Sequence, residues 1–165
     1  MNEENQDPAV DRSLILENKT TLQILNTIRL NPGLHFGAIC REVKKDRRTV
    51  RAHVEVLKSF EHIRSETIGK TTVYFESSLG KDADVFLCHL QKRDSKEIFK
   101  ILLEEPGITM HELQERLEHA IPRSSLYRKV NTLIDRGCLS ELHDETDCPR
   151  FEIPARYRPV LEKYL

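Results

Sequence analysis

Basic side chains are concentrated in one short segment of this 165-residue chain. Within residues 44–51, five cations surround a single acid, Asp46; the cations are Lys44, Lys45, Arg47, Arg48 and Arg51. The planar guanidinium of arginine forms paired hydrogen bonds with phosphate oxygens or with the O6 and N7 atoms of guanine. Like charges this close repel one another, and a polyanion would relieve the repulsion. The segment is therefore a candidate polyanion-binding site, although a run of charges can also be an ordinary solvated face.

The net charge of the whole chain, −1 at pH 7, hides an uneven distribution of charge. Residues 21–80 carry ten Lys or Arg residues against six acids, whereas residues 81–165 carry fourteen against sixteen. Attraction for nucleic acid depends on where cations cluster and not on the total charge. We therefore expect the first half of the chain to supply most of any attraction for a polyanion.

The spacing of apolar residues predicts three helices around this basic segment. Apolar residues three and four positions apart predict helices around 22–28, 36–43 and 50–57. Asp46, at the end of a tight polar turn, is a candidate N-cap for the third helix. The third helix would bury one row of Val and Leu side chains and expose its arginines on the opposite face.

A hairpin is predicted after the third helix. Residues 63–68 and 72–75 are rich in β-branched and aromatic side chains, and Gly69-Lys70 lies between them. Three helices followed by a hairpin is the order of a winged helix-turn-helix domain. Such a domain places its third helix in the major groove of DNA.

The same pattern occurs twice in the chain. Residues 24–75 align with residues 98–151 at an offset of 74, which becomes 76 after a two-residue insertion near 118–119. The second offset places Phe75 opposite Phe151. A repeat of this length indicates two copies of one small domain. We therefore predict a mainly α chain with small β-hairpin wings (α+β), built from tandem winged helix-turn-helix domains joined by a short helical linker.

The repeat also predicts the domain boundaries. We expect a flexible acidic N-terminus over 1–12, a first domain over 13–78, a linker helix over 79–93 and a second domain over 94–165. The linker is apolar and needs a packing partner. It either fills a groove between the domains or forms a dimer seam together with residues 10–16.

The ends of the predicted helices differ between the two copies. Gly137 follows the third helix of the second copy, where a left-handed residue is often needed. The first copy has Glu61 at that position, so we expect its helix to end differently. At the start of the second copy, either Asp94 or Ser95 could cap the first helix.

These motifs carry a resemblance to a known family. The stretch over 18–75 contains PGLHFGAI, RRTVRAHVEVL, a Gly-Lys turn and VYF, and it is similar to the winged-helix domains of archaeal two-domain transcriptional regulators, related to ArsR-like and MarR-like repressors. The second copy, with PGITMHELQERL and RSSLYRKVNTLIDRGCL, is similar as well. The resemblance implies a sequence-specific regulator of transcription that binds double-stranded DNA. It departs from the family at 60–62, where a Gly-containing turn is usual, and in the acidic second wing.

The expected DNA contacts lie in the turn before each third helix, on its outer arc and at the wing tip. In the first copy they are Lys44, Lys45, Arg47, Arg48, Thr49, Arg51, Ala52, Glu55 and Lys70. In the second copy they are Arg123, Ser124, Tyr127, Arg128 and Asn131. Acids surround this second set, namely Glu112, Glu115, Glu118, Asp144, Glu145 and Asp147. The second copy therefore contacts DNA, packs on the first copy or binds a protein partner.

Other sites are less well supported. His111, Glu115 and His119 recur at every fourth residue, but the two histidines would lie about 12 Å apart along a helix, too far to share one metal ion. Cys138 and Cys148 would not oppose each other in the second hairpin, which disfavours a disulfide. No nucleophile–base pair, phosphate-cradling glycine loop or cofactor motif is present. We expect a protein without metal, cofactor or enzymatic activity.

Composition bounds the remaining possibilities. Four cysteines without repeated spacing indicate a reducing, cytoplasmic location, and no apolar run approaches the roughly 20 residues of a membrane span. Two linked recognition helices bind DNA more tightly than one, which favours a homodimer. The main alternative to DNA binding is a protein-interaction scaffold, which the neutral total charge and the acidic second wing favour and the basic segment opposes.

Overall fold

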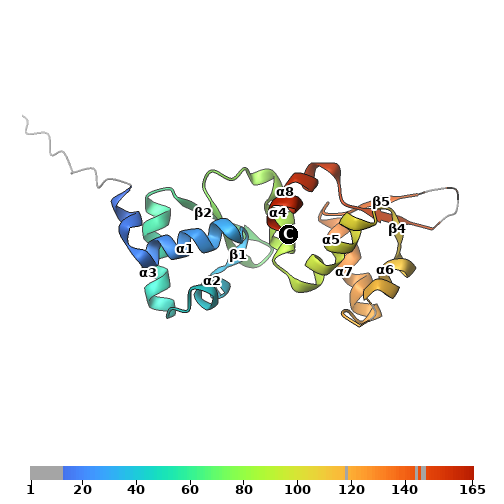
Figure 1. Cartoon of the computed structure of the whole chain (residues 1–165), viewed down its shortest axis with the longest axis horizontal. Coiled ribbons are helices and arrows are strands. Elements are labelled where there is room, and N and C mark those ends of the chain that lie inside the picture. Colours follow the sequence, from blue (N-terminus) through green and yellow to red (C-terminus); the bar gives the residue numbers. More distant parts are fainter. Residues whose placement is uncertain (1–12, 118, 144, 146–147) are drawn as a thin grey trace, which may run out of the picture. The chain divides into compact units, whose positions relative to one another are not determined.

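The computed structural model describes residues 13–117, 119–143, 145 and 148–165. The expected N-terminal segment 1–12 lies outside the described residues, as do three of the acids named above, Glu118, Asp144 and Asp147. The chain divides into two compact units (Figure 1). Unit 1 comprises the described residues up to Leu30 together with Leu34–Leu79, and unit 2 comprises Asn31–Gly33 and Gly80–Leu165.

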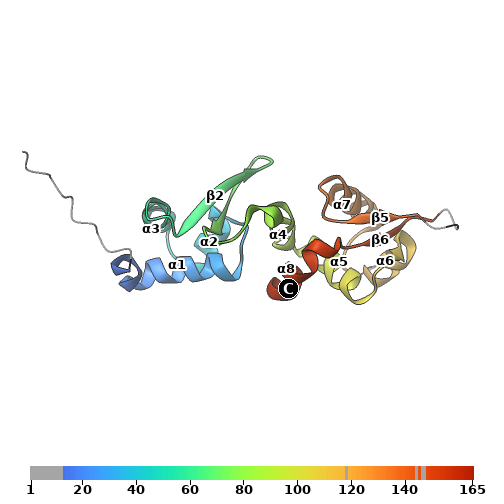
Figure 2. The ribbon, with the colours of Figure 1, turned by 90° about the horizontal axis from the view of Figure 1, so that it is seen from above.

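Unit 1 is a helical domain with a small antiparallel sheet. Its elements, in chain order, are η1 (a 3₁₀-helix, Leu14–Glu17), α1 (Lys19–Leu30), β1 (Leu34–His35), α2 (Phe36–Val43), α3 (Arg47–Ser59), β2 (Ile63–Ile68) and β3 (Thr71–Glu76). The sheet has the order β1-β3-β2. Figure 2 shows the β2–β3 hairpin extending beyond the helices of this unit. The three helices and the hairpin predicted for the first copy are confirmed.

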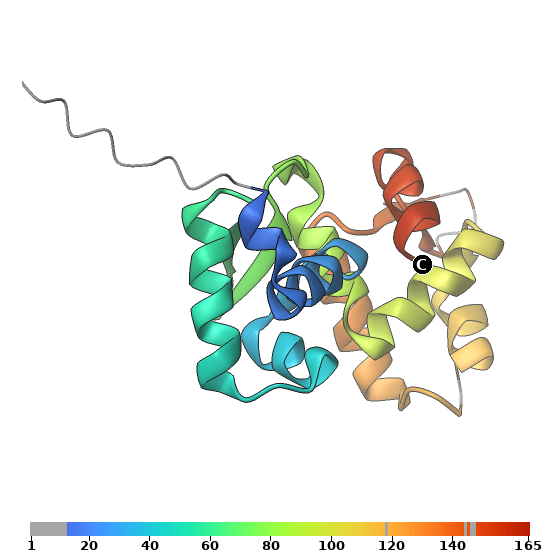
Figure 3. The same ribbon diagram turned by 60° about the vertical axis from the view of Figure 1, so that its left-hand side comes forward.

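Local hydrogen bonds set the boundaries of the helices in unit 1. The Asn18 carboxamide oxygen accepts hydrogen bonds from the backbone N–H groups of Thr20 and Thr21, at 3.0 and 3.1 Å. Lys44 ends α2 in a left-handed conformation with φ 54°. The predicted N-cap at Asp46 is confirmed, because its carboxylate accepts a 2.9 Å hydrogen bond from the backbone N–H of Thr49. Figure 3 shows α2 joined to α3 through the short segment 44–46.

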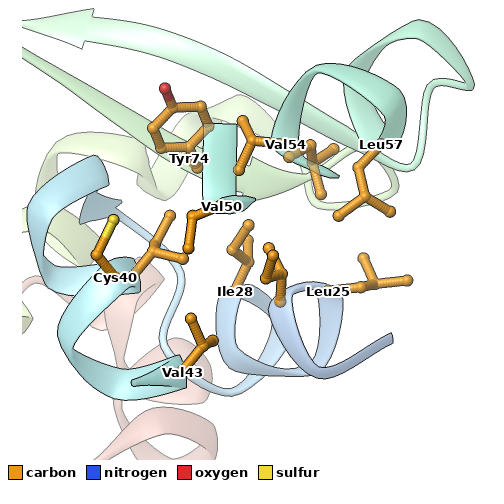
Figure 4. Close-up of a cluster of buried hydrophobic side chains, with 11 residues drawn as sticks. Leu25, Ile28, Cys40, Val43, Val50, Val54, Leu57 and Tyr74 are labelled. Carbon is orange, nitrogen blue, oxygen red and sulfur yellow. The ribbon is translucent and has the colours of Figure 1, made fainter. Parts of the chain in front are cut away.

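The core of unit 1 is formed by aliphatic side chains from all three helices and the sheet (Figure 4). Val50, Val54 and Leu57 on α3 are almost completely buried, as their spacing predicted. They pack in one cluster with residues of α1, α2, β2 and β3, namely Ile24, Leu25, Ile28, Ile39, Cys40, Val43, Ile63 and Tyr74. Burial of this row fixes the rotation of α3 about its own axis and determines which of its side chains face solvent.

The end of α3 corrects one prediction. Glu61 adopts a left-handed conformation with φ 57°, close to the 68° of Gly137. The hydrogen bonds also correspond: the N–H of residue 61 donates to the carbonyl of Lys58, and that of Gly137 to the carbonyl of Ile134. The expectation that Glu61 requires a different helix end is therefore wrong. A glutamate tolerates this conformation at a strain of about 1–2 kcal/mol.

Unit 2 has the same order of elements after a short helical segment. Its elements are η2 (Lys81–Ala83), α4 (Asp84–Leu90), α5 (Arg93–Glu104), β4 (Ile108–Thr109), α6 (Met110–Leu117), α7 (Arg123–Asp135), β5 (Ser140–Leu142), β6 (Arg150–Glu152), η3 (Ala155–Tyr157) and α8 (Arg158–Tyr164). The sheet order β4-β6-β5 repeats that of unit 1. In the described part of the chain, no helix has both the length and the apolar character needed to cross a membrane.

The apolar side chains of α4 are buried within unit 2. The ring of Phe86 lies 4.6 Å from that of Phe99 on α5 and stacks on Tyr157 at 4.4 Å, measured between ring centroids. Phe86 and Leu87 are fully buried. The structure therefore does not leave the α4 side chains free to form the dimer seam considered above, because the interior of unit 2 already contains them.

The start of α5 differs from its prediction. Lys92 is the N-cap residue, and no side chain caps this helix. Asp94 lies in the first turn, and Ser95 is fully buried. The expectation that Asp94 or Ser95 caps α5 is wrong, because the helix begins one residue before Asp94.

The register of the two sheets corrects the alignment of the repeats. Leu34 pairs with Tyr74 in unit 1, and Ile108, its equivalent at an offset of 74, pairs with Phe151 in unit 2. Tyr74 therefore occupies the place of Phe151, whereas the sequence alignment assigned that place to Phe75. Eight residues separate the paired positions Ser65 and Tyr74, whereas nine separate the equivalent pair Glu141 and Phe151, so every position after the second turn is shifted by one. Because side chains alternate along a strand, an alignment that is wrong by one residue assigns each side chain of β6 to the wrong face of the sheet.

Candidate nucleic-acid interface

Helix α3 presents a basic face to solvent. Arg47, Arg48, Arg51, Ala52 and Glu55 are exposed on this helix, opposite its buried Val and Leu row. The adjoining Lys44 and Lys45 are also exposed. The structure thus brings seven of the nine residues expected to contact DNA in the first copy onto one continuous surface of unit 1. We call the five cations of residues 44–51 the α3 basic cluster.

The cations of the α3 basic cluster have no carboxylate partners among residues 13–117, 119–143, 145 and 148–165. The one acid within the segment, Asp46, is occupied by the helix cap. Its carboxylate accepts hydrogen bonds from the backbone N–H and the hydroxyl of Thr49, at 2.9 and 2.6 Å. These hydrogen bonds lower the pKa of Asp46, the hydroxyl of Thr49 being the largest cause. The surface is therefore cationic and open to an external anion.

Two arginines of the cluster rest on one aromatic ring. The guanidinium carbons of Arg47 and Arg51 lie 5.2 and 5.4 Å from the centroid of the Phe36 ring. Phe36 is the first residue of α2 and is partly exposed. A guanidinium over an aromatic face is attracted to its π electrons. The ring therefore supports the side chains of two consecutive turns of α3.

A cavity of about 250 Å³ adjoins the same two arginines. Its walls are formed by Phe36, Arg47, Arg51, Val54, Glu55 and Tyr74. Burial raises the pKa of Tyr74, the charge of Glu55 raises it further and Arg51 opposes this, so the phenol stays protonated at neutral pH. Figure 4 shows the Tyr74 hydroxyl pointing away from the labelled aliphatic side chains.

Sequence reasoning missed Phe36 and Tyr74 as parts of this surface. Phe36 was expected only as part of the second helix and Tyr74 only as part of the hairpin, and Tyr74 also packs in the core cluster. The available signal was the four-residue spacing of Arg47 and Arg51, which places both guanidiniums on one side of α3. The sequence alone gave no indication of which ring they would meet.

Two of the nine expected contact residues do not belong to this exposed surface. Thr49 is half-buried, and its hydroxyl hydrogen is donated to Asp46, so it acts in the helix cap. Lys70 is exposed in the turn between β2 and β3, beside Gly69 with φ +66°. Lys70 is thus at the wing tip, and Figure 2 shows the tip of the hairpin of β2 and β3 lying away from α3.

The corresponding face of α7 is also exposed. It carries the five residues expected from the sequence, Arg123, Ser124, Tyr127, Arg128 and Asn131. Tyr127 has 41% of its surface exposed, and the Arg123 guanidinium carbon lies 5.9 Å from the centroid of its ring. The structure therefore brings the second set together on one helix.

Acids around α7 have partners of their own. Glu112 accepts a 2.7 Å hydrogen bond from the backbone N–H of Thr109 at the start of α6, and hydrogen bonds from Thr109 lower the pKa of Glu112. Glu115 lies 3.6 Å from the Nδ1 atom of His111. Glu145 is exposed. The second surface is thus more mixed in charge than the α3 basic cluster.

The described residues contain no group of three His, Cys, Asp or Glu side chains able to hold a metal ion. Of the three residues spaced at every fourth position, His111 lies 3.6 Å from Glu115, and His119 is exposed. All four cysteines are free thiols, as expected for Cys138 and Cys148. Burial raises the pKa of Cys88 to about 12 and that of Cys138 to about 11.

Comparison with known proteins supports the same class of domain. Residues 17–59, which contain α1 to α3, match the family of winged helix-turn-helix DNA-binding domains. The uncharacterized HTH-type transcriptional regulator MJ1398 of Methanocaldococcus jannaschii is 29% identical to this chain over 98 residues. That match covers 59% of this chain and 25% of the relative, so the chain spans about a quarter of the relative's length. The resemblance to winged helix-turn-helix regulators inferred from the motifs is confirmed.

Two solved structures align over most of the chain with low scores. One is the DIP2311 protein from Corynebacterium diphtheriae, with a TM-score of 0.33 and 10% identity, covering 86% of this chain and 27% of that chain. The other is human N-acetylserotonin methyltransferase in complex with SAM, with a TM-score of 0.29 and 14% identity, covering 82% and 45%. Both scores lie below 0.5.

Proposed function

We propose that this chain is a DNA-binding regulator of transcription with two winged-helix domains, 13–78 and 94–165, joined by the linker 79–93. The main support is the α3 basic cluster, whose five cations have no carboxylate partner among the described residues. Three of these cations lie on α3, the helix that this fold inserts into the major groove of DNA, and the other two lie in the turn before it. The proposed activity is binding, and no catalytic step is part of it.

In the first domain, each exposed side chain has a role that follows from its chemistry. Arg47 and Arg51 donate paired hydrogen bonds to guanine, and Glu55 accepts one from the N4 amino group of cytosine. Ala52 is small enough to contact the methyl group of thymine. Lys44, Lys45, Arg48 and Lys70 bind phosphates and set the orientation on the duplex, while Thr49 holds the start of the helix.

In the second domain, α7 is proposed to read a second stretch of the same duplex. Asn131 can form paired hydrogen bonds with adenine, and Arg123 or Arg128 with guanine. Ser124 and Tyr127 would bind the backbone through their hydroxyls. The acids near α7 weaken this contact and favour the alternative in which this domain binds a protein partner.

We further propose that the regulator is a homodimer. The dimer surface would be the row of exposed leucines on η1 and α1, where Leu14, Leu22 and Leu30 are 52%, 38% and 73% exposed. Two copies would place equivalent recognition helices on half-sites about one helical turn, roughly 34 Å, apart. Linking two binding events in this way raises affinity without new contacts.

The salt dependence of binding to duplex DNA tests the proposal. A preferred site is first selected from a pool of random duplexes, and its affinity is then measured at several salt concentrations. A regulator that engages six or more phosphates predicts a slope of log K against log salt of about −5 or steeper. Absence of binding at about 50 mM salt, or affinity indifferent to salt, would favour the alternative function of a protein-interaction scaffold.

A further inference from the structure

Unit 2 contains a polar cavity of about 170 Å³ beside α7. It lies between the end of α4, the first turn of α5 and one side of α7. Its walls are formed by His89, Lys92, Asp94, Ser125, Arg128, Lys129 and Thr132. A cavity of about 150 Å³ is enough for a molecule the size of benzene. The cavity therefore has room for a small ligand of about six heavy atoms.

The lining of the cavity is predominantly cationic. Three side chains carry positive charge, and Asp94 is the one carboxylate. Asp94 forms an ion pair with one of them, Lys129, at 3.7 Å, so the lining keeps an excess of positive charge. The Thr132 hydroxyl donates to the carbonyl of Arg128 at 2.8 Å, which leaves the Ser125 hydroxyl as a donor for a ligand.

Two buried polar atoms of α4 and α5 lack hydrogen-bond partners within the described structure. The Nδ1 atom of His89 is one, and this side chain is 6% exposed and lines the cavity. The Oγ atom of Ser95 is the other; this residue is fully buried and directly follows Asp94. Buried polar atoms in folded proteins are almost always paired, so the unpaired Nδ1 atom of His89 indicates a ligand or water in the cavity.

The first turn of α5 is also without a side-chain cap. Its N-cap is Lys92, which corresponds to Asn18 at the repeat offset of 74. Asn18 accepts hydrogen bonds from the first turn of α1, whereas a lysine side chain cannot accept one. The N–H groups and the positive end of this 12-residue helix therefore remain available to an anion.

We propose that the cavity between α4, α5 and α7 binds a small dianion of the phosphate class. Lys92, Arg128 and Lys129 balance its charge, and the Ser125 hydroxyl and the start of α5 donate hydrogen bonds to its oxygens. This proposal rests on unit 2 alone and does not depend on DNA binding by α3. Arg128 also belongs to the proposed DNA-reading face of α7, so an occupied cavity would change that face.

The ionisation of the His89 side chain should report on whether the cavity holds a ligand. Burial, followed by the positive charges of Lys92, Lys129 and Arg136, lowers its pKa to about 4. Arg128 and Asp94 are the other charged groups that line the cavity with it. Bound phosphate is negatively charged in both its monoanionic and dianionic forms, so it offsets the neighbouring cations and raises the pKa of His89. The imidazole resonances of His89 should therefore respond to the ligand in both position and titration midpoint.

The test is an NMR titration of the full chain at pH 7 with inorganic phosphate, against sodium chloride at equal ionic strength. We expect phosphate, and not chloride, to shift the His89 ring resonances saturably and to raise its pKa. Lys129→Gln and Arg128→Gln should each weaken phosphate binding about tenfold, because each removes a charge-assisted hydrogen bond. Lys163→Gln on α8 removes a cation outside the cavity and should change nothing.

A second arm of the experiment uses duplex DNA in place of phosphate. A response of His89 to duplex but not to free phosphate would assign the site to the monoanionic phosphodiester backbone of DNA and would overturn the proposal of a small phosphate-class ligand. The absence of a saturable response to both probes would overturn the proposal. A response that both Lys129→Gln and Arg128→Gln leave unchanged would overturn it as well.

Discussion

The guanidinium carbon of Arg51 lies 5.4 Å from the centroid of the Phe36 ring, so that a side chain of α3 rests on the first residue of α2. Arg47 approaches the same ring at 5.2 Å. A contact of this kind is worth about 0.5–1 kcal/mol at an exposed site. It also restricts both long side chains before any ligand arrives, which reduces the entropy lost on binding. Phe36 thus positions two arginines of the α3 basic cluster.

Two substitutions of Phe36 should distinguish its positioning of the two arginines from its contribution as apolar bulk. Phe36→Leu keeps apolar bulk but removes the aromatic face, so we expect it to weaken binding to a selected duplex by about 0.5–1 kcal/mol. Phe36→Tyr keeps the face and should bind like the unmodified chain. Affinities are measured by fluorescence anisotropy, with thermal denaturation confirming that both variants fold. Equal affinity of Phe36→Leu and Phe36→Tyr would show that the ring has no such role.

The shared left-handed conformation of Glu61 and Gly137 predicts opposite effects of exchanging these residue types. Glu61→Gly should raise the free energy of unfolding by about 1 kcal/mol, because glycine adopts positive φ without strain. Gly137→Ala should lower it by a similar amount. An added Cβ at Gly137 would meet its nearest neighbour, the Arg156 Nη2 atom, at an ordinary 3.5 Å, so strain and not a clash is the expected cause. Chemical denaturation measures the free energy of unfolding of each variant, and a loss of stability in Glu61→Gly would contradict this account.

The lowered pKa of His89 predicts a specific dependence of stability on pH. The unfolded chain takes up a proton at this residue near pH 6.5, whereas the folded chain resists it until about pH 4. The free energy of unfolding should therefore decrease as the pH falls from about 6.5 toward 4. His89→Gln should reduce this decrease, and His111→Gln, at an exposed histidine, should not. Denaturant titrations at several pH values measure the effect, and identical pH profiles for the unmodified chain and His89→Gln would refute it.

The proposed dimer surface predicts the effect of charge on exposed leucines. The double variant Leu22→Asp, Leu30→Asp should sediment as a monomer at concentrations where the unmodified chain is a dimer. Leu142→Asp, at a leucine on β5 that is 41% exposed, serves as the matched control and should stay dimeric. Analytical ultracentrifugation distinguishes the two states. A monomeric unmodified chain at every concentration would exclude the dimer.

Features of unit 1 that depend on local periodicity could be predicted from the sequence. The row Val50, Val54 and Leu57 determines which face of α3 is buried, and Asp46 begins that helix as expected. The basic face follows directly from these two facts. In unit 2, the end of α7 at Gly137 could be predicted equally well, because a glycine after a periodic apolar stretch commonly ends a helix.

Features that depend on tertiary contacts or on small energy differences could not be predicted. Tyr74 and Phe75 are both aromatic, so only the length of the hairpin decides which of them is structurally equivalent to Phe151. Glu61 adopts a conformation that favours glycine by only about 1–2 kcal/mol, less than the packing of the domain can offset. The cavity of unit 2 joins residues from three helices, and no spacing in the sequence indicates that His89 meets Lys129 there.

The most direct test of the account is the affinity of Arg51→Ala for a selected duplex and for a scrambled duplex of equal length. If Arg51 reads a base from the major groove, the variant should lose about 1–3 kcal/mol on the selected duplex and much less on the scrambled one. Lys163→Ala, which removes a cation from α8, should leave both affinities unchanged. Unchanged affinity of Arg51→Ala for the selected duplex would contradict the assignment of the α3 face to DNA.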